Sequence, residues 1–131
     1  MKKTSYAFTK TVNRDFDQTI QKLTEELKKE GFGILTEIDV QATLKKKLDV
    51  DFRPYKILGA CNPSFAYKAL QAEEQIALML PCNVIVYVNE EKETVVAAID
   101  PEASMTAIDN PELQGINKEV QTKLRSVIER C

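Results

Sequence analysis

Two neighbouring apolar segments constrain the fold of this chain more than any other feature of its sequence. Residues 84–88 read Val-Ile-Val-Tyr-Val and residues 95–99 read Val-Val-Ala-Ala-Ile. Their β-branched side chains are typical of strands, and the polar residues 89–93 between them predict a hairpin turn. Because successive side chains of a strand point to opposite faces of a sheet, this hairpin is apolar on both faces. The fold therefore has to provide cover for two faces of one sheet.

The remaining segments predict a chain in which strands and helices alternate. Apolar or alternating segments predict strands over residues 5–12, 32–38, 55–60, 76–80, 82–88 and 94–99. Apolar side chains at helical spacing predict helices over residues 14–30, 40–48, 63–71 and 111–128, with a short helical turn over residues 101–105. This order predicts a single α+β domain over residues 1–131, with a mainly antiparallel sheet and helices packed on one face.

A single layer of helices leaves the second face of the central hairpin uncovered. Either the short helix over residues 40–48 crosses to that face, or a second subunit packs there. We expect a homodimer, because monomeric proteins seldom expose extended apolar patches.

The composition argues against several classes of function. The net charge of −2 and the pI near 5.3 argue against a nucleic-acid partner, since such proteins usually present a basic face. No apolar segment reaches the roughly 18 residues of a membrane helix, and none follows the charged start as in a signal peptide. We therefore expect a cytoplasmic protein with no membrane partner. The chain has no histidine, which removes the commonest acid–base catalyst and metal ligand and favours a protein that is not an enzyme.

Two cysteines stand beside breaks in the predicted elements. Cys61 directly precedes a helix start at Asn62 and Pro63, where the helix dipole and free backbone N–H groups favour a thiolate. Cys82 directly follows Pro81, which interrupts an apolar strand-like segment. If the two breaks lie side by side, the thiols form a redox pair, a sulfur-carrying site or a soft-metal site.

The alternative is that both cysteines are packing residues. Free cysteine is among the most buried residue types and often acts as a small hydrophobic side chain. The flanking residues of Cys61 and Cys82 are largely apolar, so burial without a nearby cation would leave both thiols inert. Two cysteines also supply too few ligands for a closed zinc site, and we predict no metal. Cys131, the last residue, is expected to be an exposed bystander.

The segments around these cysteines resemble the family known as domain of unknown function 302. The resemblance rests on Leu-Gly-Ala-Cys-Asn-Pro ending at Pro63 and on Leu-Pro-Cys-Asn-Val ending at Val84. A leading Tyr-x-Phe, a Gly-Phe-Gly turn, an Asp-Pro and the last helix follow the family order, over about residues 6–128. The resemblance implies a bacterial or archaeal cytoplasmic α+β protein, similar to a single decorated TATA-box-binding-protein-like copy and dimeric. Fold likeness does not carry DNA binding with it.

The family has no established activity, so the resemblance supplies candidate positions but no catalytic roles. These candidate functional residues are Cys61, Asn62, Pro63, Pro81 and Cys82. The leading hypothesis is a dimeric module that binds or senses a small apolar or sulfur-containing ligand near them, with no cofactor identified. One alternative is a thiol-based redox or sulfur-handling protein with Cys61 as nucleophile and Cys82 as resolving thiol. The other is a structural interaction protein whose cysteines are buried and inert.

Overall fold

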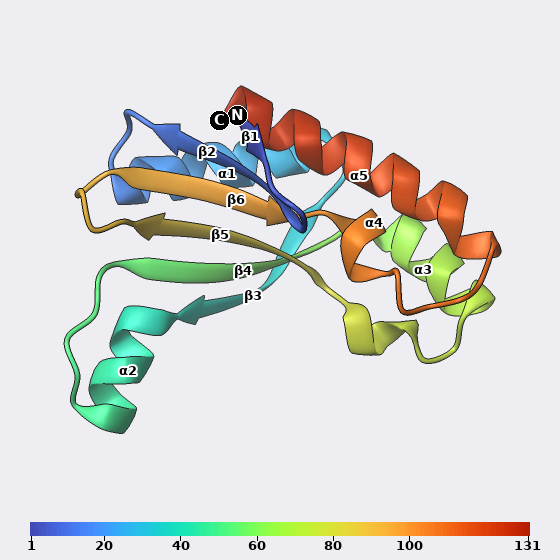
Figure 1. Cartoon of the computed structure of the whole chain (residues 1–131), viewed down its shortest axis with the longest axis horizontal. Coiled ribbons are helices and arrows are strands. Elements are labelled where there is room, and N and C mark those ends of the chain that lie inside the picture. The colour runs from blue at the N-terminus through green and yellow to red at the C-terminus, as the bar shows by residue number, and fades with distance from the viewer.

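One antiparallel sheet of six strands organises the molecule (Figure 1). The computed structural model describes all of residues 1–131. Its strands are β1 (Lys2–Lys3), β2 (Ala7–Val12), β3 (Gly33–Asp39), β4 (Tyr55–Cys61), β5 (Cys82–Val88) and β6 (Thr94–Ile99), in the order β1-β2-β6-β5-β4-β3. The predicted hairpin is the central β5–β6 pair. The α+β class and the antiparallel sheet are confirmed.

Helices cover one face of this sheet and gather at one end of it. They are α1 (Phe16–Lys29), α2 (Val40–Leu48), α3 (Pro63–Ala72), the 3-10 helix η1 (Ile76–Met79), α4 (Pro101–Ser104) and α5 (Glu112–Arg130). Figure 1 shows α1 and α5 lying along the same side of the sheet, with α3, η1 and α4 at the end where β4 and β6 finish. The prediction of helices on one face is therefore confirmed.

The first helix shows how local sequence sets these boundaries. Asp15 begins α1, because its side chain accepts from the backbone N–H of Gln18 while the Gln18 side chain accepts from the Asp15 N–H. Gly31 ends it with a backbone φ of +84°, a conformation that glycine adopts without strain. The chain then turns directly into β3.

The main core lies between the sheet and the two long helices. Neighbouring positions across four strands form one fully buried row: Leu58, Val84, Ala98 and Phe8. Helical side chains close over this row, among them Leu23 and Leu27 of α1 and Leu124 and Ile128 of α5. Burying such apolar side chains stabilises the fold by about 1.5–3 kcal/mol each.

A buried carboxylate joins the two long helices beside this core. Glu26 of α1 is buried, and it pairs with Lys22 at 3.0 Å, with Lys29 at 2.9 Å and with Arg130 of α5. These cations, Arg130 foremost, lower the pKa of Glu26 from 4.5 to about 2. The carboxylate therefore stays ionised where a lone buried acid would tend to be neutral.

Residues 76–80 do not form the predicted strand, and this expectation was wrong. The segment forms η1 instead, with Leu78 83% exposed and Ile76 buried. The reason lies in the neighbouring strands. The β4–β5 ladder ends at Ala60 and Cys82, after which the chain enters α3, so a strand before Pro81 would find no partner. Local backbone hydrogen bonds satisfy the segment instead, such as that from the Leu80 N–H to the Ala77 carbonyl.

The helix α3 packs mainly against α5 and η1 rather than against the sheet. Ala69 belongs to a second, smaller core with Ile76, Met105 and Leu113. This second core lies beyond the end of the sheet.

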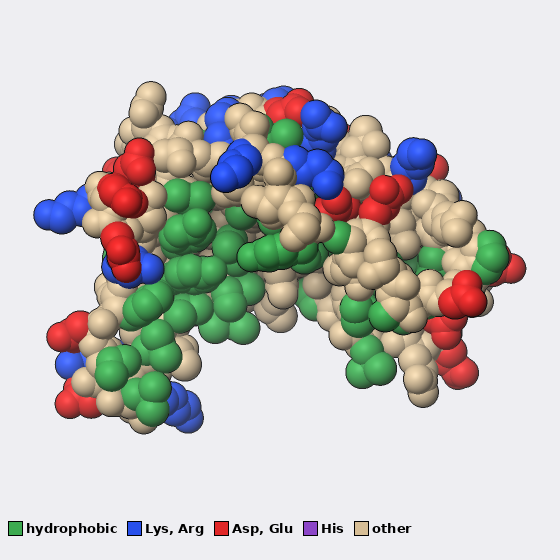
Figure 2. Space-filling model, viewed as in Figure 1, with side chains coloured by type: hydrophobic (Ala, Val, Ile, Leu, Met, Phe, Trp, Pro, Cys, Tyr) green, Lys and Arg blue, Asp and Glu red, His purple; other side chains and the backbone are tan.

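The other face of the sheet carries apolar rows without a covering layer. One row runs through Ile57, Ile85 and Ala97, and the next places Tyr55 against Tyr87, whose rings stack with centroids 5.1 Å apart. Figure 2 shows this apolar surface as a continuous green area over the sheet. None of the residues of α2 is buried, so the helix over residues 40–48 does not supply the cover. We call this surface the open face.

Candidate functional site

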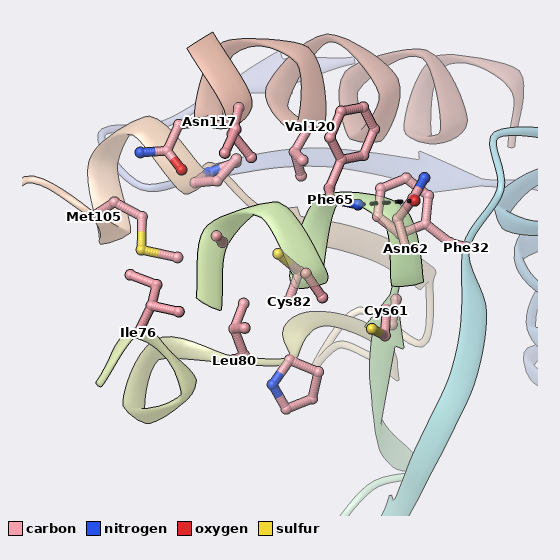
Figure 3. A pocket seen from close by; sticks show the side chains of 16 residues that line it. Phe32, Cys61, Asn62, Phe65, Ile76, Leu80, Cys82, Met105, Asn117 and Val120 are labelled. Atoms are coloured by element: carbon pink, nitrogen blue, oxygen red, sulfur yellow. Dashed lines mark hydrogen bonds between the residues drawn. The ribbon is translucent and has the colours of Figure 1, made fainter. Parts of the chain in front are cut away.

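A single apolar pocket lies where the ends of β4 and β5 meet the second core (Figure 3). It is lined by 16 residues, Phe32, Ala60, Cys61, Asn62, Phe65, Ala66, Ala69, Ile76, Leu80, Pro81, Cys82, Pro101, Met105, Ile116, Asn117 and Val120. None of these residues is charged. Only two of them, Asn62 and Asn117, carry a polar nitrogen or oxygen in the side chain.

Little of the pocket is wide enough for a water molecule. About 40 Å³ of it can take the centre of a water molecule, and the total of about 480 Å³ between its lining atoms includes open solvent. One water needs on the order of 10–15 Å³ by this measure, so the pocket has room for a few waters or a short chain of atoms.

Four of the five candidate residues from the sequence line this pocket. Cys61, Asn62, Pro81 and Cys82 meet there, as the resemblance and the two predicted strand breaks suggested. Pro63 does not line it. Pro63 occupies the first position of α3, where its missing N–H costs nothing, and its place is explained by the helix start.

Asn62 is held by two contacts within the protein. Its side-chain amide donates to the Glu30 carbonyl at the end of α1, at 3.2 Å, and its oxygen accepts from the Phe65 N–H at a long 3.5 Å. The same amide nitrogen lies 3.0 Å from where a side chain at Gly31 would begin. Asn62 therefore fixes the start of α3 against the end of α1, which leaves it little capacity for a ligand.

Pro81 rests on the backbone of the neighbouring strand. A Cβ atom at Gly59 would lie 2.7 Å from the Pro81 ring and 2.1 Å from the Thr36 hydroxyl, so only glycine fits between them without a shift. This close approach is what the glycine near the end of β4 predicts. It brings the chain across the sheet to form one wall of the pocket.

The two cysteines are neighbours at the ends of adjacent strands. Cys82 pairs with Ala60 across the β4–β5 ladder, and Cys61 is the next residue. Both thiols are free and half-buried. In Figure 3, Cys82 lies nearer the middle of the pocket and Cys61 toward the end formed by Phe32 and Asn62. The sequence left open whether the two strand breaks lie side by side, and the ladder places them next to each other.

The surroundings of Cys82 disfavour its thiolate. Burial, and secondarily the neighbouring Cys61, raises the pKa of Cys82 from 9.0 to about 11. No lysine or arginine lines the pocket to counter this effect. Near pH 7 the Cys82 side chain is therefore a neutral, weakly polar thiol.

Cys131 is not the exposed residue that the sequence analysis expected. It is buried in the main core, and its carbonyl accepts from the Arg14 guanidinium at 2.7 Å. Burial, and then the nearby Glu26 carboxylate, raises the pKa of its thiol. The prediction failed because position in the chain carries no information on packing, whereas the end of α5 folds back over β2.

Several pocket residues escaped the sequence analysis. They are Phe32, Phe65, Leu80, Met105, Ile116, Asn117 and Val120. Ile116 and Val120 belong to the apolar stripe of α5, which predicts burial but not which cavity they face. Asn117 gave no signal, because an asparagine on a polar helix surface looks the same whether it faces solvent or a pocket rim.

The structure was also compared with the requirements of a metal site and of a membrane-spanning helix. No group of three or more His, Cys, Asp or Glu side chains is placed to hold a metal ion. None of the helices is both long and apolar enough to cross a membrane.

Comparison with known proteins gives the family of the chain. A family model described as "Domain of unknown function DUF302" matches residues 8–131. The crystal structure of an uncharacterised conserved DUF302 protein from Bacillus stearothermophilus is similar, with a TM-score of 0.88 and 31% identity over 95% of this chain and 97% of that chain. The comparison with curated proteins gives no match. A family match over almost the whole length, together with the shared fold, shows that the chain belongs to the DUF302 family.

Proposed function

We propose that this protein is a binding module that holds a small apolar or sulfur-containing ligand in the pocket beside Cys61 and Cys82. The observation that carries the proposal is an uncharged pocket lined almost entirely by apolar side chains. Concave apolar sites with a few polar groups are the usual form of small-molecule sites. The sulfur atoms of Met105 and of the two cysteines add polarisable contacts along its walls.

The absence of charge in the lining favours binding over acid–base catalysis. A general acid or base must reach the reacting group, and the side chains that commonly serve are Asp, Glu, His, Lys, Tyr and Cys. Of these, the pocket presents only its two cysteines. The lining thus offers shape and apolar contact, and little to drive proton transfer.

Thiol chemistry is the rival, and the pKa of Cys82 argues against its second step. A resolving thiol attacks as the thiolate, and a pKa of about 11 leaves Cys82 almost wholly protonated near pH 7. Labelling of the native protein with a maleimide, followed by mass spectrometry, distinguishes an unreactive Cys82 from a resolving thiol. We expect Cys82 to label at least tenfold more slowly at pH 7 than in urea. Equal rates in the two conditions would revive the redox interpretation.

The ligand proposal is tested by filling the pocket. Ala66→Leu places extra atoms in the lining of the pocket, whereas Ser64→Leu adds the same side chain at an exposed position of α3 and serves as the matched control. Short alkyl thiols and thioethers are titrated into 15N-labelled protein. We expect saturable shifts at pocket amides in the parent and in Ser64→Leu, and weakened binding in Ala66→Leu. Shifts that never saturate in the parent would overturn the proposal.

We further propose that the module acts as a homodimer built through the open face. From β2 to β4 and at Ile38 of β3, the rows that form this face carry no charged side chain: Ile38, Ile57, Ile85, Ala97 and Thr9, with Tyr55, Tyr87, Val95 and Thr11 beside them. Lys2 of the short edge strand β1 pairs with Thr9 and is the one charged residue at the end of the first row. Charged strand residues such as Lys10, Glu37 and Lys56 belong to the alternate positions, on the helix side. A face whose only charge lies at its edge can place its apolar centre against a second copy with little like-charge repulsion, as a two-fold interface requires.

A further inference from the structure

A second, wider hollow adjoins the apolar pocket and differs from it in chemistry. About 630 Å³ of it can take the centre of a water molecule, and its lining is mostly polar: Glu102, Met105, Thr106, Ile108, Asp109, Asn110, Gln114, Gly115, Asn117 and Lys118. Met105 and Asn117 line both hollows. The two therefore share a rim, at which an apolar space gives way to a polar one.

Asn117 is the polar group available at this rim. The other asparagine of the apolar pocket, Asn62, has its side chain engaged by Glu30 and Phe65. Asn110, in the polar hollow, is engaged by Ala72, Glu73 and Glu112. Unlike the side chains of Asn62 and Asn110, the Asn117 side chain forms none of the hydrogen bonds just described. Figure 3 shows it beside Met105, at the end of the pocket away from Cys61.

We propose that the ligand is a short amphiphile, with its apolar tail in the pocket and a hydrogen-bonding head held by Asn117 at the rim. This inference rests on the proposed function and adds the class of ligand to it. An amide offers both a donor and an acceptor, so it suits a hydroxyl or an amine head. A purely apolar ligand would leave Asn117 unused, and a purely polar one would not fill the apolar space.

The charges that line the polar hollow favour some ligand head groups over others. Glu102 and Asp109 supply two negative charges, and Lys118 supplies one positive charge, so the lining is net negative. The positive end of the α5 dipole is confined to about the first turn, and α5 starts at Glu112, five positions before Asn117. The field at the rim therefore favours a neutral or cationic head over a carboxylate.

The experiment titrates the folded chain with three ligands that share one tail: 1-hexanol, hexylamine and hexanoate. Binding is followed by NMR at the pocket amides and at the Asn117 side-chain NH₂. We expect hexanol and hexylamine to bind at least five-fold more tightly than hexanoate. We also expect Asn117→Leu to weaken hexanol binding by about two- to ten-fold, the usual value of one hydrogen bond.

Gln114→Leu is the matched control, since Gln114 lines only the polar hollow and is exposed. It should change hexanol binding by less than two-fold. If Asn117→Leu perturbs folding by circular dichroism, Asn117→Ala replaces it. Hexanoate binding as tight as hexanol, or unchanged hexanol binding in the Asn117 variant, overturns the amphiphile inference and leaves the apolar pocket standing. Failure of all three ligands to shift any pocket amide overturns the proposed function itself.

Discussion

The two faces of the central sheet are built from the same strands but differ in how deeply their apolar side chains are buried. On the helix side, Leu58 and Val84 are adjacent and completely buried. On the open face, Ile57 and Ile85 are adjacent one position away, equally apolar, and only half-buried. Strand propensity is therefore the same for both rows. Apolar side chains that the fold of the single chain leaves partly exposed, such as Ile57 and Ile85, are therefore concentrated on one face, where they can contribute to association.

The largest effect should come from placing a charge on the open face. Ile85→Lys puts an ammonium in the middle of the proposed dimer interface, where burying it unpaired would cost several kcal/mol. We expect a dimeric parent and a monomeric, folded variant by sedimentation equilibrium, with circular dichroism as the check on folding. Leu78→Lys, on the exposed η1, is the control and should leave the mass unchanged. A monomeric parent at high micromolar concentration would contradict the dimer proposal.

The next comparison uses the same change on both faces. Leu58→Ala removes a fully buried side chain from the main core and should lower the free energy of unfolding by about 2–5 kcal/mol in urea titrations. Ile57→Ala, one residue away on the open face, should cost less than half of that under dilute conditions in which the chain is monomeric. Equal losses would mean that the open face contributes to folding of the single chain as much as the helix face does.

The contribution of the Glu26 ion pairs on the helix side can be measured from the pH dependence of the free energy of unfolding. Because the folded pKa of about 2 lies below the value of 4.5 for a free glutamate, the ionised form stabilises the fold. That contribution is complete above about pH 4.5 and is lost as the pH falls through about 2. Glu26→Gln should lower the free energy of unfolding at pH 7 by about 1–3 kcal/mol and flatten this acid dependence. An unchanged acid profile in the variant would show that other carboxylates dominate it.

An effect of similar size should come from the contact between Gly59 and Pro81. Gly59→Ala forces a methyl group against the Pro81 ring and the Thr36 hydroxyl, and should cost about 1–3 kcal/mol. Adding Thr36→Ala removes one of the two clashes and should recover part of the loss. If the double variant is no more stable than the single one in urea, the clash lies wholly with Pro81.

The sequence predicted much of this arrangement through local signals. The helix start at Asn62 and Pro63 is confirmed, and the predicted hairpin of β5 and β6 lies at the centre of the sheet. The candidate site at Cys61 and Cys82 followed from two strand breaks and from the family resemblance, and both residues line the pocket.

What the sequence could not supply depends on contacts between distant segments. Residues 76–80 are apolar enough for a strand, but a strand needs a neighbour, and none continues beside them. The burial of Cys131 depends on where α5 ends relative to β2. The position of Asn117 at the shared rim depends on α4 and on Met105 packing beside α5. Periodicity reports which side of an element is apolar, and it does not report what that side meets.

The hydrogen bonds of Asn62 make one wall of the pocket harder to change by substitution than the other. Its amide ties the start of α3 to Glu30, whose side chain in turn pairs with Lys123 and Arg130 of α5. A substitution on that wall of the pocket disturbs three helices at once. The opposite wall, formed by Leu80 after η1, has no such linkage, and η1 exposes Leu78 to solvent. Under the proposed function, we expect substitutions in η1 to change the size of the pocket with less effect on stability than substitutions in the Cys-Asn-Pro wall.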